Sequence, residues 1–221
     1  MRKQFVQTLL GVAMLAMCAA LVAMPAMADS VAYVQTSDNN SAYASQNDTS
    51  GGGLGNFATA YDNFQVSLND QFTELDWVGS FFGAPGTGNI TAFTINFYAD
   101  NAGTPGAQLS STSVTNFSQA AMGVDNIGDP LFAYSTAINF NAAAGTQYWL
   151  SIVPDQAFPP QWGWETGVGG DGAAYQCFLG SCGPVGNDLA FTLTAVPEPS
   201  SLLLLAGSLP ALALRLRRKR Q

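Results

Sequence analysis

The sequence predicts an all-β fold, a single antiparallel β-sandwich with a jelly-roll-like arrangement. Three features of the body of the chain support this class. Apolar residues recur at every second position in several short segments, Gly, Pro and Asn separate those segments, and no helical pattern of useful length lies between them. We expect about eight to ten strands, flanked by an N-terminal signal helix and a short C-terminal hydrophobic helix.

Period-two alternation identifies the side chains that should face the core. The alternating residues are Phe64, Val66 and Leu68; Phe93, Ile95 and Phe97; Phe132, Tyr134, Thr136, Ile138 and Phe140; and Leu189, Phe191 and Leu193. A further segment, QYWLSIV at residues 147–153, is apolar on both faces. All of these segments fit the strands of an antiparallel architecture.

The chain divides into four regions: a signal peptide (1–28), an arm (29–60), a β-sandwich domain (61–195) and a C-terminal segment (196–221). The arm is dominated by Ser, Asn, Asp and Gly, a composition that buries too little apolar area to offset the cost of ordering. We therefore expect a loop or a loosely held arm, with one short strand at residues 31–34, before a single folded domain.

Positive charge is confined to the two ends of the chain. All 7 Lys and Arg residues lie within the first three or the last seven positions. Between residues 29 and 196 lie 14 of the 15 acidic residues, all except Glu198, so this segment has a net charge of −14. Such a segment cannot neutralise phosphates, which excludes nucleic acid as a natural partner. Cations are better suited than phosphates as partners of this acidic segment. A solvated acidic surface is the simpler interpretation of its charge.

The first 28 residues have the pattern of a secretory signal peptide. Two basic residues precede a long apolar run, and Ala26 and Ala28 form a small-x-small cleavage site just before Asp29. The general secretion machinery should therefore export the body.

The C-terminal segment begins with Val196, Pro197, Glu198 and Pro199. An uncharged run of 13 residues follows at 202–214. As a helix this run spans about 20 Å, less than the roughly 30 Å of a bilayer core. The basic residues after it should keep the C-terminus in the cytoplasm, so the run would act as a transient inner-membrane anchor.

This order of a PEP motif, a Leu-rich run and a basic tail resembles the PEP-CTERM sorting signal of Gram-negative bacteria. The resemblance implies that an exosortase recognises the segment, removes it and passes the body to the cell surface or the extracellular matrix. The body at residues 61–195 is also similar to a sandwich domain common in PEP-CTERM exported proteins. That second resemblance implies a fold and a cellular location, but it does not imply an activity.

Cys177 and Cys182 are the only cysteines that remain once the signal peptide is removed. Their C-x4-C spacing in an exported protein predicts a local disulfide that closes a Gly-containing loop. A metal site would normally include His or further Cys residues, which the body does not contain.

The body lacks most catalytic side chains, so we expect no enzymatic activity. Without His, Lys or Arg it can form neither a Ser-His-Asp nucleophile nor a cationic phosphoryl-transfer site. Glu74 and Glu165 leave a glycoside hydrolase with paired carboxylates as an alternative. Their simpler interpretation is as solvated strand positions.

We expect no cofactor other than a candidate calcium ion. Asp100, Asp125 and Asp129 lie in tight loops with Asn and Gly, and calcium prefers oxygen ligands of this kind. Neither loop matches a complete calcium-binding pattern, and Asx–Gly turns are the simpler interpretation of both.

Trp162 and Trp164 share one face of a predicted strand. Exposed, they would form a stacking surface for sugar rings; buried, they would be part of the core.

The leading interpretation of the chain is a non-enzymatic protein of the cell surface or extracellular matrix, associated with exopolysaccharide. A carbohydrate-binding module that uses the two exposed Trp residues is the alternative.

Overall fold

The computed structural model describes residues 29–82 and 86–197, which form strands and no helix. The strands are β1 (Ser30–Ala44), β2 (Gln46–Asp48), β3 (Gly55–Gln65), β4 (Asp70–Phe82), β5 (Ala92–Asp100), β6 (Pro105–Val114), β7 (Ser118–Val124), β8 (Pro130–Ala142), β9 (Gln147–Gln156), β10 (Gln161–Val168), β11 (Ala174–Phe178), β12 (Ser181–Val185), β13 (Asp188–Leu189) and β14 (Phe191–Pro197). The expected signal helix and C-terminal helix lie outside these residues. Within them, no helix has the length and apolarity needed to cross a membrane.

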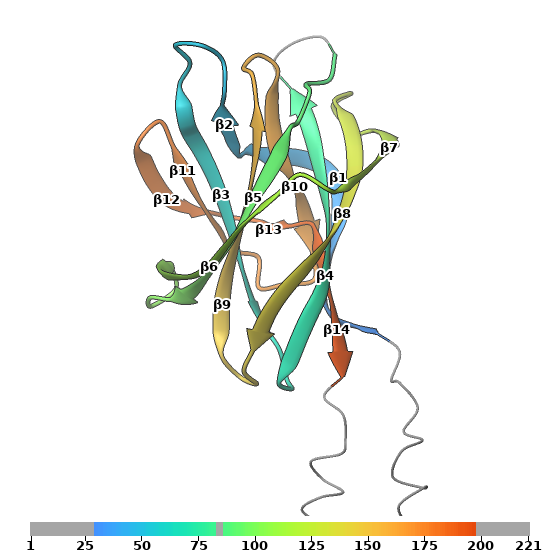
Figure 1. Cartoon of the computed structure of the whole chain (residues 1–221), viewed down its shortest axis with the longest axis vertical. Helices are drawn as coiled ribbons and strands as arrows, with labels where there is room; N and C mark the ends of the chain where they lie inside the picture. The colour runs from blue at the N-terminus through green and yellow to red at the C-terminus, as the bar shows by residue number, and fades with distance from the viewer. Residues whose placement is uncertain (1–28, 83–85, 198–221) are drawn as a thin grey trace, which may run out of the picture.

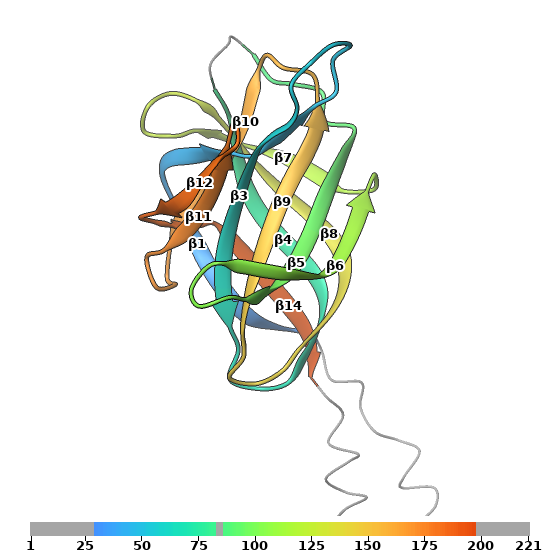
Figure 2. The same cartoon turned by 90° about the vertical axis from the view of Figure 1, so that its left-hand side faces the viewer.

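The strands form two sheets of seven strands each, which lie against one another (Figures 1 and 2). Sheet A has the order β13-β10-β1-β14-β4-β8-β7, and sheet B has the order β12-β11-β3-β2-β9-β5-β6. All pairings are antiparallel except the short one between β2 and β9. Ser30 at the start of β1 pairs with Ala195 near the end of β14, so the described chain enters and leaves the domain at one place.

The expected strand at residues 31–34 is confirmed as part of β1, but the loop or loosely held arm expected for the rest of residues 29–60 is wrong. Strand β1 lies between two partners, pairing with β14 at Val31 and with β10 at Tyr43. The same region contains β2 and the first half of β3. Backbone hydrogen bonds hold a strand between two neighbours whatever its side-chain polarity, which is why the composition was misleading. The described residues form 14 strands in all, more than the expected eight to ten.

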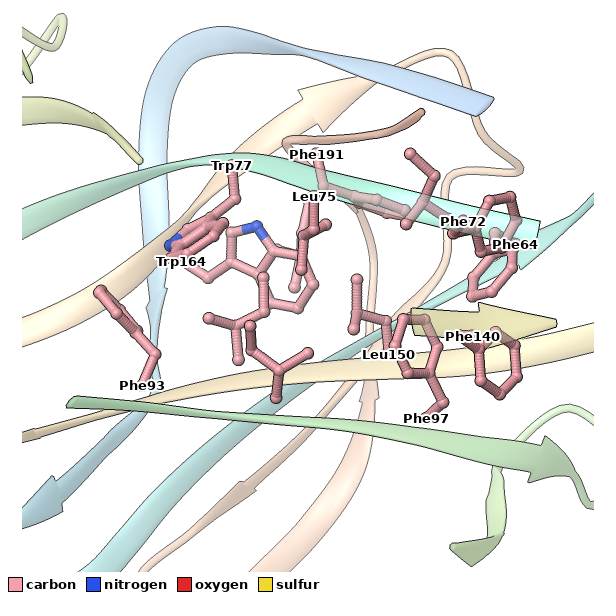
Figure 3. Close-up of a cluster of buried hydrophobic side chains, with 14 of the residues drawn as sticks. Phe64, Phe72, Leu75, Trp77, Phe93, Phe97, Phe140, Leu150, Trp164 and Phe191 are labelled. Atoms are coloured by element: carbon pink, nitrogen blue, oxygen red, sulfur yellow. The ribbon is translucent and has the colours of Figure 1, made fainter. Parts of the chain in front are cut away.

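One hydrophobic core lies between the two sheets (Figure 3). The rings of Phe97 on β5 and Phe140 on β8 stack across it, with centroids 4.0 Å apart and planes at 6°. Phe64 on β3 contacts Phe191 on β14 edge to face at 6.2 Å. The alternation predicted these four inward-facing side chains. It was wrong for Leu68, which is 69% exposed because β3 ends before it.

Candidate functional site

A row of polar and aromatic side chains crosses the outer face of sheet B. Strand register aligns Tyr175 with Tyr61, Tyr61 with Ser151, and Ser151 with Asn96, so one row spans β11, β3, β9 and β5. Their neighbours in sequence, such as Leu150 and Ile95, are buried in the core. Because side chains alternate along a strand, the core on one face places this row on the opposite face.

A groove of about 170 Å³ lies over this row. Its lining residues are Asn47, Asn56, Thr59, Tyr61, Thr94, Asn96, Tyr98, Val153 and Asp155. The Asn96 amide donates to Oγ of the buried Ser151 at 3.3 Å, and the Tyr98 hydroxyl lies 3.3 Å from the same oxygen. Ser151 thus fixes the positions of two polar groups of the groove wall.

Three tyrosines form the aromatic part of this surface. The ring of Tyr61 packs edge to face against Tyr98 at 5.5 Å and against Tyr175 at 6.3 Å. Each of the three is half-buried. Burial, followed by the nearby Tyr98, raises the pKa of Tyr61. Its hydroxyl therefore stays neutral near pH 7 and can both donate and accept a hydrogen bond.

Amide and carboxylate groups form the other end of the groove. The Asn47 side chain donates to Oδ1 of Asp155 at 2.8 Å. The Thr59 hydroxyl donates to Oδ1 of Asn56 at 3.1 Å. Among the described residues that line the groove, Asp155 is the one carboxylate. The groove therefore combines ring edges with neutral hydrogen-bonding groups, but its lining does not contain the pair of carboxylates that glycoside hydrolysis requires.

No pattern in the sequence predicted this groove. Thr94, Asn96 and Tyr98 are the polar positions between the inward residues of β5, and their polarity was the available signal. Bringing them beside Tyr61 and Asp155 required the strand order β3-β9-β5, which alternation within one strand does not reveal.

Trp162 and Trp164 do not form a sugar-stacking surface, because both are fully buried. The Trp162 indole nitrogen donates to the Tyr134 hydroxyl at 3.3 Å, and that of Trp164 donates to the Ala190 carbonyl at 2.9 Å. Their shared face of β10 points into the core. The alternative with exposed Trp residues is therefore wrong, and the core interpretation is confirmed.

The three candidate calcium ligands form turns. Oδ1 of Asp100 accepts hydrogen bonds from the Trp149 indole nitrogen at 2.8 Å and from the Gly103 amide at 3.1 Å. Oδ1 of Asp125 accepts from the amides of Ile127 at 3.0 Å and Asp129 at 2.8 Å. Burial and the nearby Asp125 raise the pKa of Asp129. Asp100 is thus far from the 125–129 turn in sequence and is engaged in its own hydrogen bonds.

The two glutamates of the hydrolase alternative have different surroundings. Glu74 is exposed on β4 and accepts a 2.8 Å hydrogen bond from the Ser135 hydroxyl. Glu165 on β10 is fully buried. A buried carboxylate without access to the surface cannot reach a polysaccharide, so Glu165 does not fit the role of a glycosidase acid or base.

The predicted disulfide is confirmed. Cys177 on β11 and Cys182 on β12 are directly paired across a hairpin, and their sulfurs are bonded. This crosslink lies at the edge of sheet B and joins β12 to β11, the strand that also carries Tyr175.

The residues of the two export signals lie mostly outside the described residues. Ala26, Ala28, Glu198 and Pro199 are among those not described, and Asp29 is the first described residue. At the other end, Val196 pairs with Gln71 and Pro197 with Asp70 of β4.

No family model matches this chain, and no curated protein is significantly similar to it in sequence.

Proposed function

We propose that this chain is a non-enzymatic carbohydrate-binding protein of the bacterial surface or exopolysaccharide matrix, built on a jelly-roll-like β-sandwich. The groove on the outer face of sheet B carries this proposal. It places the half-buried rings of Tyr61 and Tyr98 beside Asn96, Asn47 and Asp155. Sugar rings offer apolar C–H faces to aromatic side chains and hydroxyls to amides and carboxylates, so this lining suits them.

The export part of the proposal rests on the two terminal signals and on the compartment that the disulfide suits. The general secretion machinery would remove residues 1–28, and an exosortase would remove the segment that begins near Val196. The Cys177–Cys182 crosslink is stable in an oxidising compartment outside the cytoplasm. A net charge of −14 between residues 29 and 196 makes calcium-bridged acidic polysaccharide a suitable surrounding matrix.

Affinity electrophoresis in gels containing the producing organism's exopolysaccharide tests the binding. Tyr61→Ala and Tyr98→Ala should each weaken retardation about 3- to 10-fold, since one stacking contact or hydrogen bond contributes about 0.5–1.5 kcal/mol. Tyr98→Phe keeps the ring and should lose less. Tyr43→Ala on sheet A is the matched control, because Tyr43 is also half-buried but lies outside the groove.

Retardation that is the same in the wild-type protein and both groove variants would exclude this groove as the binding site. Equal loss in Tyr43→Ala would show that the effect comes from lowered stability. The export proposal has its own test, mass spectrometry of the protein from the surface fraction. We expect an N-terminus at Asp29 and no residues from the basic tail, and an unprocessed tail in the wild type would contradict sorting.

A further inference from the structure

The charge of the sheet B groove comes from Asp155, the one acidic or basic side chain among the described residues that line it. Asp155 is half-buried near the end of β9, where it is aligned with Asn47 of β2 and with Ala92 of β5. The amide and the hydroxyl of Thr91 donate to its backbone carbonyl at 2.9 and 3.1 Å. Segments on both sides of β9 thus fix the backbone that carries this carboxylate.

The two carboxylate oxygens of Asp155 have different surroundings. Oδ1 accepts a hydrogen bond from the Asn47 side chain at 2.8 Å, which orients the carboxylate. Oδ2 has no such partner in the described part of the chain, and it is not enclosed by protein. An accessible carboxylate oxygen is a strong acceptor for a ligand that brings a positively charged donor.

The aromatic and the charged ends of the groove are separated along β9. Tyr61 is aligned with Ser151, and Asp155 lies four positions further along the same strand. Strands rise about 3.3 Å per residue, so the two ends lie about 13 Å apart. In Figure 2 β9 lies between β3 and β5, which carry Tyr61 and Tyr98. A single sugar ring is shorter than this distance, so a chain of sugars is needed to contact both ends.

Neutral polar side chains line the groove between these ends. Thr94 and Asn96 on β5 are aligned with Val153 and Ser151 on β9. Their hydroxyl and amide groups form hydrogen bonds with sugar hydroxyls but carry no charge. Any preference of the groove for a charged or an uncharged sugar therefore depends on Asp155.

The whole body places this groove in a negative field. No Lys, Arg or His occurs between residues 4 and 214, and the net charge between residues 29 and 196 is −14. An anionic glycan would find no cationic partner in the groove, and the domain would repel it. Bridging calcium could hold such a glycan elsewhere on the surface, but Asp155 alone supplies too few carboxylate oxygens for a bridge in the groove. A positively charged ligand is attracted instead.

We propose that the groove binds a glycan with free amino groups. One sugar ring packs against Tyr61 and Tyr98, and the ammonium group of a sugar further along the chain donates to Oδ2 of Asp155. This inference rests on the proposed carbohydrate-binding function and adds the class of sugar. N-acetylation removes the positive charge, so the groove should discriminate against the N-acetylated form of the same glycan.

Calorimetric titration with two matched ligands, a glucosamine hexamer and the N-acetylglucosamine hexamer, tests this assignment. The wild type should bind the amino hexamer about 3- to 10-fold more tightly at low salt, because a charge-assisted hydrogen bond is stronger than a neutral one. The preference should shrink in about 0.5 M NaCl. Asp155→Asn should lose most of it. Glu74→Gln removes the same unit of charge from the exposed face of β4, so this matched control should keep the preference.

Equal or tighter binding of the N-acetylated hexamer by the wild type would overturn the assignment. An equal loss of preference in Asp155→Asn and Glu74→Gln would also overturn it, because net charge alone would then explain the attraction. Hexalysine brings amines without sugar rings, and its binding as tightly as the amino hexamer would exclude a sugar-specific site. Circular dichroism shows whether Asp155→Asn is folded, and the wild-type comparison of the two hexamers does not depend on that variant.

Failure of the proposed function gives a different result. In that case exopolysaccharide would retard the wild type, Tyr61→Ala and Tyr98→Ala equally, whatever the hexamers do. If retardation depends on both tyrosines but neither hexamer binds, the groove binds carbohydrate and the amino-sugar assignment is wrong.

Discussion

The indole nitrogen of Trp149 donates a hydrogen bond of 2.8 Å to Oδ1 of Asp100. Trp149 is 2% exposed on β9, and Asp100 ends the neighbouring strand β5. The same oxygen accepts from the Gly103 amide, so one carboxylate satisfies a buried indole and shapes the β5–β6 turn. Asp100 thus contributes to the stability of the sheet that carries the candidate groove.

Replacing Asp100 should show how much this hydrogen bond contributes to the stability of the domain. Asp100→Ala removes the acceptor and leaves the buried Trp149 nitrogen unsatisfied, so the free energy of unfolding should fall by about 1–3 kcal/mol. Asp100→Asn retains an acceptor oxygen and should lose less. Urea denaturation followed by Trp fluorescence measures both; equal midpoints for the wild type and Asp100→Ala would contradict the structural role.

Gly79 provides the space for Trp162. A Cβ atom at Gly79 would collide with Cζ2 and Cε2 of the Trp162 ring, which is fully buried and cannot move aside. Gly79→Ala should therefore lower the free energy of unfolding by about 1–3 kcal/mol or more, as overpacking in cores does. Gly51→Ala is the control, since a Cβ there meets no atom within 4 Å. The prediction is wrong if both variants have the same urea midpoint.

Asp48 should make the fold sensitive to acid. Its carboxylate accepts hydrogen bonds from the Ser50 hydroxyl and from the amides of Leu54, Ser50 and Phe158, which hold the pKa of Asp48 well below its usual range. Because the folded pKa is depressed, the stabilisation is fully present above the unfolded pKa of about 4 and is lost as the pH falls below it.

Comparing the wild type with Asp48→Asn across pH measures this contribution. At pH 7 the variant should be less stable, because an amide is a weaker acceptor than a carboxylate. The difference between their urea midpoints should narrow as the pH falls from about 5 toward 2. A difference that is constant over this range would show that the carboxylate charge is not responsible.

The sequence predicted much of the strand pattern because alternation is a local property. Phe93, Ile95 and Phe97 are buried as their period-two spacing indicated. The Cys177–Cys182 pair was equally local, since its two residues lie on adjacent strands of one hairpin. Alternation fixes which side chains share a face, but it does not say which strands are neighbours.

For the candidate sites, strand order was decisive. Tyr61 meets Tyr98 only because β9 lies between β3 and β5, and the three strands are far apart along the chain. Glu165 is another example. From its sequence neighbours we expected a solvated strand position, whereas Glu165 is fully buried in the folded domain.

By itself, the sequence determined the all-β class, the inward-facing residues, the disulfide and the absence of positive side chains from the body, since each follows from local spacing or composition. Only the tertiary structure decided that a polar segment would become β1, that Trp162 would be core and that Glu165 would lie without a partner. These outcomes depend on contacts between distant segments, whose hydrogen bonds and packing outweigh the preferences of any single stretch of chain.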